Sequence, residues 1–172
     1  MLKTRLLVHS ALCLSLSFLA CMSSPGVITP TPEPAISGDR IPTSQGDLII
    51  HPLNHATFVM SWAGKMIYVD PVGGAERFAG LPAPDVIFVT DIHGDHLNAD
   101  TLAAIVQAET VIVAPQAVYD MLPAALQEKT QVLANGGTLT VADIGVEAIP
   151  MYNITPERLD RHPKGRGNGY VL

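Results

Sequence analysis

Cysteine is scarce in this chain of 172 residues, where only Cys13 and Cys21 are present. Cys13 lies inside an apolar N-terminal run that is predicted to be removed, which leaves Cys21 as the one cysteine of the mature protein. A single cysteine forms no disulfide within the chain and builds no site of several thiolates. Any metal must therefore be held by histidines and carboxylates.

Positive charge is also scarce. The chain has 10 lysines and arginines but 16 aspartates and glutamates, and its formal net charge is −6. Nucleic acids bind to basic faces, and the only basic cluster is the short run Arg158, Arg161, Lys164 and Arg166. We therefore expect no nucleic-acid partner. The chain also lacks the Gly-x-Ser-x-Gly elbow of serine hydrolases, so nothing indicates a serine nucleophile.

The N-terminus is typical of an export signal. Lys3 and Arg5 precede a mostly apolar segment, residues 6–20, which is shorter than the roughly 20 residues that cross a bilayer. It ends in Phe18-Leu19-Ala20-Cys21, which resembles the lipobox of bacterial lipoproteins except that Phe18 stands where leucine is preferred. Residues 1–21 are thus predicted to be a signal peptide with Cys21 as the lipidation site. The alternatives are an ordinary cleaved signal and an uncleaved anchor.

That interpretation places the protein at the periplasmic face of the bacterial envelope, held by lipid in the outer membrane. Residues 22–44 contain five prolines among serine, threonine and glycine, a composition that favours an extended tether. The folded domain is predicted to span residues 45–172.

The domain is expected to begin with hairpins and to continue with strand–helix–strand units, which predicts an α/β layered fold. The run 85–90 is apolar almost throughout, as in a strand buried on both faces. Residues 167–172 indicate a turn entering a strand, which suggests a truncated chain; a short edge strand is the alternative. Strands are predicted over residues 47–53, 56–62, 65–70, 85–90, 110–114, 131–133, 138–141 and 146–149, and helices over residues 98–108 and 115–121, the latter with Leu126 as a candidate continuation.

Four residues able to bind metal lie within six positions directly after the run 85–90: Asp91, His93, Asp95 and His96. Ligands of α/β sheets collect at the carboxyl ends of strands, where a rigid base supports a loop. Imidazole and carboxylate suit Zn²⁺, Mn²⁺ or Fe²⁺. The segment therefore predicts a metal site, with zinc as the expected ion. A polar loop with incidental histidines is the alternative.

The segment Asp91-Ile92-His93-Gly94-Asp95-His96 resembles the His-x-His-x-Asp-His signature of the metallo-β-lactamase-fold hydrolases. Asn54-His55-Ala56-Thr57 and Val69-Asp70-Pro71 resemble, more specifically, the branch of ascorbate-6-phosphate lactonase-like and N-acyl-phosphatidylethanolamine phospholipase-like proteins. The resemblance runs from about residue 46 to residue 172. It implies an α/β fold, the N-terminal half of a four-layer αββα sandwich. The family's later Gly-Asp-Thr-like strand and final histidine have no counterpart after His162.

The resemblance also implies roles for single residues. His93 matches a ligand of a first metal, and Asp95 and His96 match ligands of a second. Asp95 is also the candidate catalytic residue, since the family uses this carboxylate near the attacking water. Asp91 departs from the signature, where histidine is usual, so it is either an oxygen ligand or a partner that orients a histidine.

His162 is the expected third histidine of the site, with an incidental loop histidine as the alternative. His55 and Asp70 are expected to support the site without binding metal. Their alternatives are a strand histidine satisfied by the backbone and a turn aspartate before Pro71.

The implied activity is hydrolysis of an ester, lactone, amide or phosphodiester by a metal-activated water. The substrate is expected to be a small or lipid-like molecule, and the cofactor one or two Zn²⁺ ions, with Mn²⁺ or Fe²⁺ as alternatives. A second hypothesis is a non-catalytic, lipid-anchored metal-binding protein. A third is an inactive truncated fragment that does not fold stably alone.

Overall fold

The computed structural model describes residues 36–172. The predicted signal peptide, its lipidation site Cys21 and most of the predicted tether lie outside the described residues. Within residues 36–172, no helix has the length and apolar character needed to cross a membrane.

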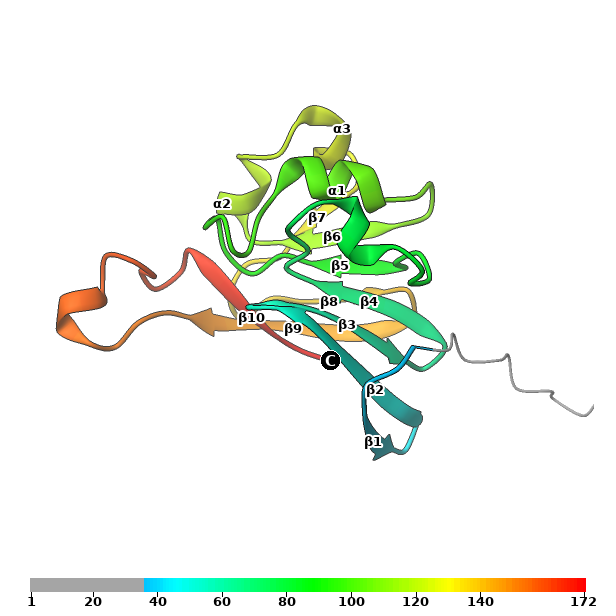
Figure 1. Ribbon diagram of the computed structural model, residues 1–172. Coiled ribbons are helices and arrows are strands. Elements are labelled where there is room, and N and C mark those ends of the chain that lie inside the picture. The colour runs from blue at the N-terminus through cyan, green and yellow to red at the C-terminus, as the bar shows by residue number, and fades with distance from the viewer. Residues whose placement is uncertain (1–35) are drawn as a thin grey trace, which may run out of the picture. The chain divides into compact units, whose positions relative to one another are not determined.

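Strands in the described part of the chain form two sheets (Figure 1). The larger sheet has the order β1-β2-β3-β4-β5-β6-β7, antiparallel up to β4 and parallel from β4 to β7. The smaller sheet, β10-β9-β8, is antiparallel. The strands are β1 (Asp39–Thr43), β2 (Gly46–Asn54), β3 (Thr57–Trp62), β4 (Lys65–Val69), β5 (Val86–Phe88), β6 (Val111–Ala114), β7 (Thr130–Val132), β8 (Thr138–Val141), β9 (Ile144–Met151) and β10 (Gly167–Val171).

Short helices cover one face of the larger sheet, and the smaller sheet lies against the other (Figure 1). The helices are α1 (Ala99–Ile105), α2 (Gln116–Tyr119) and α3 (Ala124–Gln127), with 3-10 turns η1 (Ala75–Phe78) and η2 (Pro156–Arg158). This helix–sheet–sheet order is three layers of the predicted four-layer sandwich, so the predicted fold class is confirmed.

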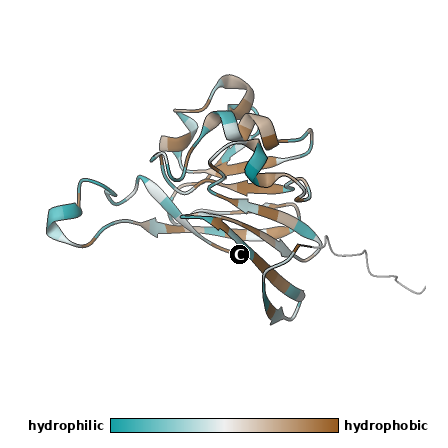
Figure 2. Ribbon diagram, viewed as in Figure 1, coloured by the Kyte–Doolittle hydropathy of each residue, from teal (hydrophilic) through white to brown (hydrophobic). Residues whose placement is uncertain are grey.

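The central strands of the larger sheet contribute apolar side chains to two cores, one on each face, because successive side chains of a strand point to opposite faces of the sheet. Ile87 and Val89 face the helices and pack with Leu102 of α1. Val86 and Phe88 face the smaller sheet. Figure 2 shows the strands of the larger sheet mostly apolar and the β9–β10 connection mostly polar. The strand predicted over 85–90 is therefore confirmed as β5, which is shorter, Val86–Phe88, and is buried on both faces.

The folded part begins earlier than residue 45. β1 lies inside the segment predicted to be a tether, and it pairs with β2 through its whole length. Ile36, just before it, is buried in the core on the helical face. All five residues of β1 are exposed, including Pro42, so the strand shows no apolar alternation in the sequence. Proline is tolerated there because β1 is an edge strand.

The second predicted helix does not continue to Leu126. α2 ends at Tyr119, and α3 starts only after Pro123. Proline has no N–H and disfavours helical geometry in the residue before it, so it separates two single turns. The first predicted helix is confirmed as α1, with the Asn98 side chain accepting a hydrogen bond from the Thr101 N–H at its start.

Asn168 on β10 of the smaller sheet forms hydrogen bonds with residues that follow β5 and β7 of the larger sheet. Its side-chain amide donates to the Leu133 carbonyl at 2.7 Å, and its side-chain oxygen accepts from Asn135 at 2.7 Å. Its backbone N–H donates to the carbonyl of Thr90 at 3.0 Å. Only 1% of Asn168 is exposed, so these groups have no water to replace a lost partner.

We expect Asn168→Ala to lower the free energy of unfolding by about 1–3 kcal/mol, because it leaves buried polar partners unsatisfied. Urea unfolding followed by circular dichroism measures this loss. Asn153→Ala is the matched control, since the Asn153 amide bonds in an exposed turn and should change stability by about 0.5 kcal/mol or less. Equal losses in the two variants would contradict the role of Asn168 as a link between the sheets.

Candidate metal centre

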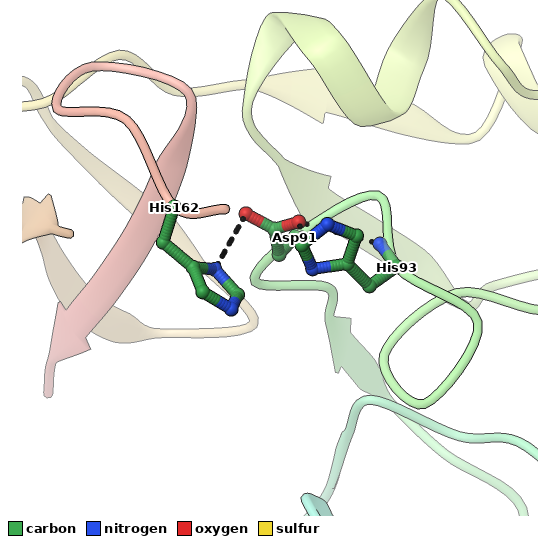
Figure 3. A group of neighbouring side chains, drawn as sticks. All are labelled: Asp91, His93 and His162. Atoms are coloured by element: carbon green, nitrogen blue, oxygen red, sulfur yellow. Dashed lines mark hydrogen bonds and ion pairs between the residues drawn. The ribbon is translucent and has the colours of Figure 1, made fainter. Parts of the chain in front are cut away.

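Asp91, His93 and His162 meet at the carboxyl end of β5 (Figure 3). Asp91 and His93 lie in the loop that follows β5, whereas His162 lies in the connection between β9 and β10. Their potential ligand atoms lie within 4.8 Å of one another. Nδ1 of His162 is 3.4 Å from the Asp91 carboxylate, and Nδ1 of His93 is 3.3 Å from it. The structure thus brings together three residues that the sequence predicts as ligands.

The carboxylate of Asp91 is completely buried at the centre of this group, with a side-chain exposure of 0%. Its Oδ1 accepts hydrogen bonds from the backbone N–H groups of Ile92 at 2.7 Å and His93 at 3.3 Å. Burial raises the pKa of a carboxyl group, but hydrogen bonding to Arg166 and the charge of that guanidinium outweigh it here. The pKa of Asp91 is lowered below its usual value, so the group is an anion at neutral pH.

Arg166 is a site residue that the motif reasoning missed. Its Nη2 lies 3.2 Å from Oδ1 of Asp91, and its Nε lies 3.3 Å from Oδ2. The same Nη2 is 3.3 Å from Nε2 of His93 and also donates to the carbonyl of Arg161. The sequence held one indication of this residue. Asp91 replaces the usual histidine of the signature, and its negative charge, if buried, needs a nearby cation.

Gly167 lets β10 approach the end of β5 closely. A Cβ at this position would lie 2.9 Å from the Asp91 carboxylate and 2.9 Å from the backbone carbonyl of Thr90. Both distances are shorter than side-chain carbon atoms tolerate, so glycine is needed here. The close approach brings the neighbouring Arg166 within reach of Asp91.

His96 belongs to a second hydrogen-bonded group beside the first. Its Nδ1 lies 2.8 Å from Oδ2 of Asp70 and 2.9 Å from the hydroxyl of Thr90. Thr90 donates to the same carboxylate through its hydroxyl at 2.6 Å and its N–H at 2.7 Å. With Nδ1 fixed in this way, Nε2 is the ring nitrogen of His96 that can bind a metal. Thr90 is a further supporting residue that the motif did not reveal.

Asp70, which accepts the hydrogen bond from His96, has an uncommon backbone conformation. It lies just after β4 with φ of 45°, in the left-handed region that aspartate adopts more readily than most residues. Thr57 donates a hydrogen bond to its carbonyl at 2.6 Å. Asp70 thus lies against His96, where the sequence expected a supporting residue.

Asp95 and His55 lie away from the central cluster. The Asp95 carboxylate is 59% exposed, and its Oδ2 is 3.7 Å from Nε2 of His96. His55 is exposed in the turn between β2 and β3, with φ of 48°. The structure therefore places Asp95 beside a candidate ligand but brings His55 into neither group.

The donor set suits a divalent metal of the zinc type. One ionised carboxylate and two imidazoles are the ligands that Zn²⁺, Mn²⁺ and Fe²⁺ accept in proteins. They would supply three ligands, which is the number that catalytic zinc sites use while leaving a position for water. His162 and His93 meet edge to face with ring centroids 4.7 Å apart, and His96 lies 6.2 Å from His162. The residues of a second site are thus adjacent to the first.

A sequence profile described as a beta-lactamase superfamily domain matches residues 50–172. No curated protein matches the chain significantly. Among solved structures, a protein from Parabacteroides distasonis described as a metal-dependent hydrolase matches at 34% identity with a TM-score of 0.68. That match covers 80% of this chain and 61% of the other, so the chain spans about three fifths of that protein's length.

Two more distant structures share the fold. Igni18, a metallo hydrolase from the archaeon Ignicoccus hospitalis, matches at 18% identity and a TM-score of 0.54, over 72% of this chain and 55% of the other. CmlA, a diiron β-hydroxylase from Streptomyces venezuelae, matches at 22% identity and a TM-score of 0.52. That match covers 80% of this chain and 28% of the other. At these identities the likeness concerns the fold alone, so it selects no metal for this chain.

We expect His96 in the metal-free protein to titrate above its ordinary pKa, because the hydrogen bond that its Nδ1–H donates to Asp70 raises the pKa more than burial lowers it. The folded-state pKa exceeds the unfolded value of about 6.5. The resulting stabilisation is therefore fully present below about pH 6.5 and is lost as the pH rises through the folded-state pKa.

Nuclear magnetic resonance titration of the histidine rings measures this effect. Asp70→Asn should lower the pKa of His96, whereas Asp47→Asn, which removes an exposed carboxylate paired with Arg40, should leave it unchanged. An unchanged midpoint for His96 in Asp70→Asn would contradict the assigned cause.

Proposed function

This chain belongs to the β-lactamase superfamily, and from that premise we propose that it is a metal-dependent hydrolase with zinc as its metal. The proposed reaction is attack of water on an ester, lactone, amide or phosphodiester. We propose a small or lipid-like substrate, in the manner of the branch that the sequence resembles, and no nucleic acid.

The convergence of Asp91, His93 and His162 carries this proposal. Asp91 and His162 are 71 positions apart in the sequence, yet their side chains lie within 3.4 Å. An incidental surface histidine has no reason to lie against a fully buried carboxylate. The group also lies at the carboxyl end of a parallel strand, where α/β sheets place their ligands.

A metal held there would lower the pKa of a water molecule toward about 7 and would supply positive charge to stabilise the negative charge that develops on the substrate. Asp91, His93 and His162 would hold a first ion. His96, oriented by Asp70, and Asp95 would contribute to a second. The exposed carboxylate of Asp95 is open to solvent, where it can accept a hydrogen bond from the attacking water and orient it.

A non-catalytic metal-binding role is the second candidate. One observation favours it: the Arg166 guanidinium contacts both Asp91 and His93, two of the three residues of the first site. A protein in which this contact persisted would bind metal weakly at the first site and hydrolyse nothing.

We also propose that the protein is exported and held at the periplasmic face of the outer membrane by lipid on Cys21. The apolar run that ends at Cys21 supports this proposal. Labelled fatty acid should be incorporated into wild type and Cys13→Ala but not into Cys21→Ala. Equal labelling of the two variants would exclude Cys21 as the acceptor.

We expect His93→Ala and His162→Ala each to weaken zinc binding by more than the roughly 10–100-fold loss typical of an outer-shell substitution, because each removes a ligand. Elemental analysis of the purified full chain measures bound zinc. His51→Ala is the control, because His51 lies on β2 and bonds to the backbone of Ser37.

Catalysis is tested separately. Hydrolysis of a panel of an ester, a lactone, an amide and a phosphodiester by the wild-type protein is assayed with and without chelator.

Zinc content that stays at the wild-type level in both ligand variants would contradict the proposed site. Zinc binding that is lost in both variants, without chelator-sensitive hydrolysis of any panel member by wild type, would favour the non-catalytic role.

A further inference from the structure

One nitrogen of Arg166 lies among the candidate ligand atoms of Asp91 and His93. Nη2 is 3.2 Å from Oδ1 of Asp91, 3.3 Å from Oδ2 and 3.3 Å from Nε2 of His93. Three potential ligand atoms of the metal centre thus surround a single guanidinium nitrogen. The Arg166 side chain is 20% exposed, so most of it is enclosed by the site.

The need for this cation follows from Asp91. A neutral histidine at the same position would leave a metal-free site without net charge. A completely buried carboxylate instead requires a positive partner, since an isolated buried charge is strongly unfavourable. Within residues 36–172 the Asp91 carboxylate has Arg166 as its only arginine or lysine partner.

The guanidinium contacts are also loose. Charge-assisted bonds between N–H and a carboxylate are typically about 2.7–2.9 Å, whereas those between Arg166 and Asp91 measure 3.2–3.3 Å. The Arg166 backbone directly precedes β10, which begins at Gly167 and pairs with β9. Its long side chain can leave the site by rotamer changes that give up these contacts and the bond to the Arg161 carbonyl, while the backbone stays in place.

We propose that Arg166 is an internal counter-cation that competes with the metal for Asp91 and His93. The guanidinium and a divalent ion cannot share the position, because both are positive and both use the same lone pairs. Arg166 neutralises Asp91 in the metal-free protein, and metal entry displaces it. This inference rests on the proposed metal site. It assigns to Arg166 the role of a counter-ion of Asp91, which the family signature does not contain.

Arg166→Gln tests the proposal, because it removes the charge while keeping a polar side chain. We expect zinc to bind the full chain of this variant about ten-fold more tightly than wild type, as follows if wild type holds its site open in about one molecule in ten. Competition with a chromogenic chelator measures the affinity. Lys164→Gln is the matched control, since it removes one positive charge from the same connection, where Lys164 lies over the Tyr152 ring. Its zinc affinity should equal that of wild type.

Thermal unfolding gives a second readout that does not depend on activity. Metal-free Arg166→Gln should melt below metal-free Lys164→Gln, and added zinc should raise its melting temperature by more than that of wild type. If Arg166→Gln does not fold without metal, refolding in zinc should recover it, because the ion replaces the missing cation. Failure to recover in zinc would overturn the proposal.

The outcomes separate this inference from the proposed function. Zinc binding by Arg166→Gln that is no tighter than that of Lys164→Gln overturns the competition but leaves the metal site standing. Weaker binding in Arg166→Gln also overturns it, since the arginine would then support Asp91 as a ligand. Absence of zinc binding in wild type and every variant overturns both.

Discussion

The fully buried, ionised carboxylate of Asp91 organises the functional end of this molecule. Asp91 follows the central strand β5, and its two oxygens must be paired because water does not reach them. Backbone N–H groups satisfy part of that need, but the charge requires a cation. Removing the partner of a buried charge typically costs about 3–5 kcal/mol. Arg166 supplies that cation in this structure, and the proposed metal would supply it in place of Arg166.

The two sides of the site differ in how firmly they are held. On one side, Asp70 and Thr90 fix His96 through bonds of 2.6–2.9 Å at the ends of adjacent parallel strands. On the other side, His162 and Arg166 come from the connection between β9 and β10, and their contacts with Asp91 are 3.2–3.4 Å. A rigid sheet edge therefore presents ligands to a more loosely packed connection, which suits a site that exchanges one cation for another.

Much of the fold could be predicted from the sequence, because its central strands have clear apolar patterns and its first helix has a recognisable cap at Asn98. β1 escaped prediction, since an exposed edge strand containing Pro42 shows no burial pattern. It is held by backbone pairing with β2 and by the Arg40–Asp47 ion pair, which leave no apolar pattern in the sequence. His162 could be placed in the site only through the family resemblance, because contacts between distant segments have no local signal. Arg166 and Thr90 were missed for the same reason, although the unusual Asp91 already required a cation.

The position of the metal is the central claim, and anomalous X-ray diffraction at the zinc absorption edge tests it most directly. Crystals of the full chain grown with zinc should show an anomalous peak within bonding distance of Asp91, His93 and His162. The Arg166 guanidinium should then no longer contact the Asp91 carboxylate. A guanidinium still bound to Asp91, with zinc elsewhere or without any anomalous peak, would contradict the account.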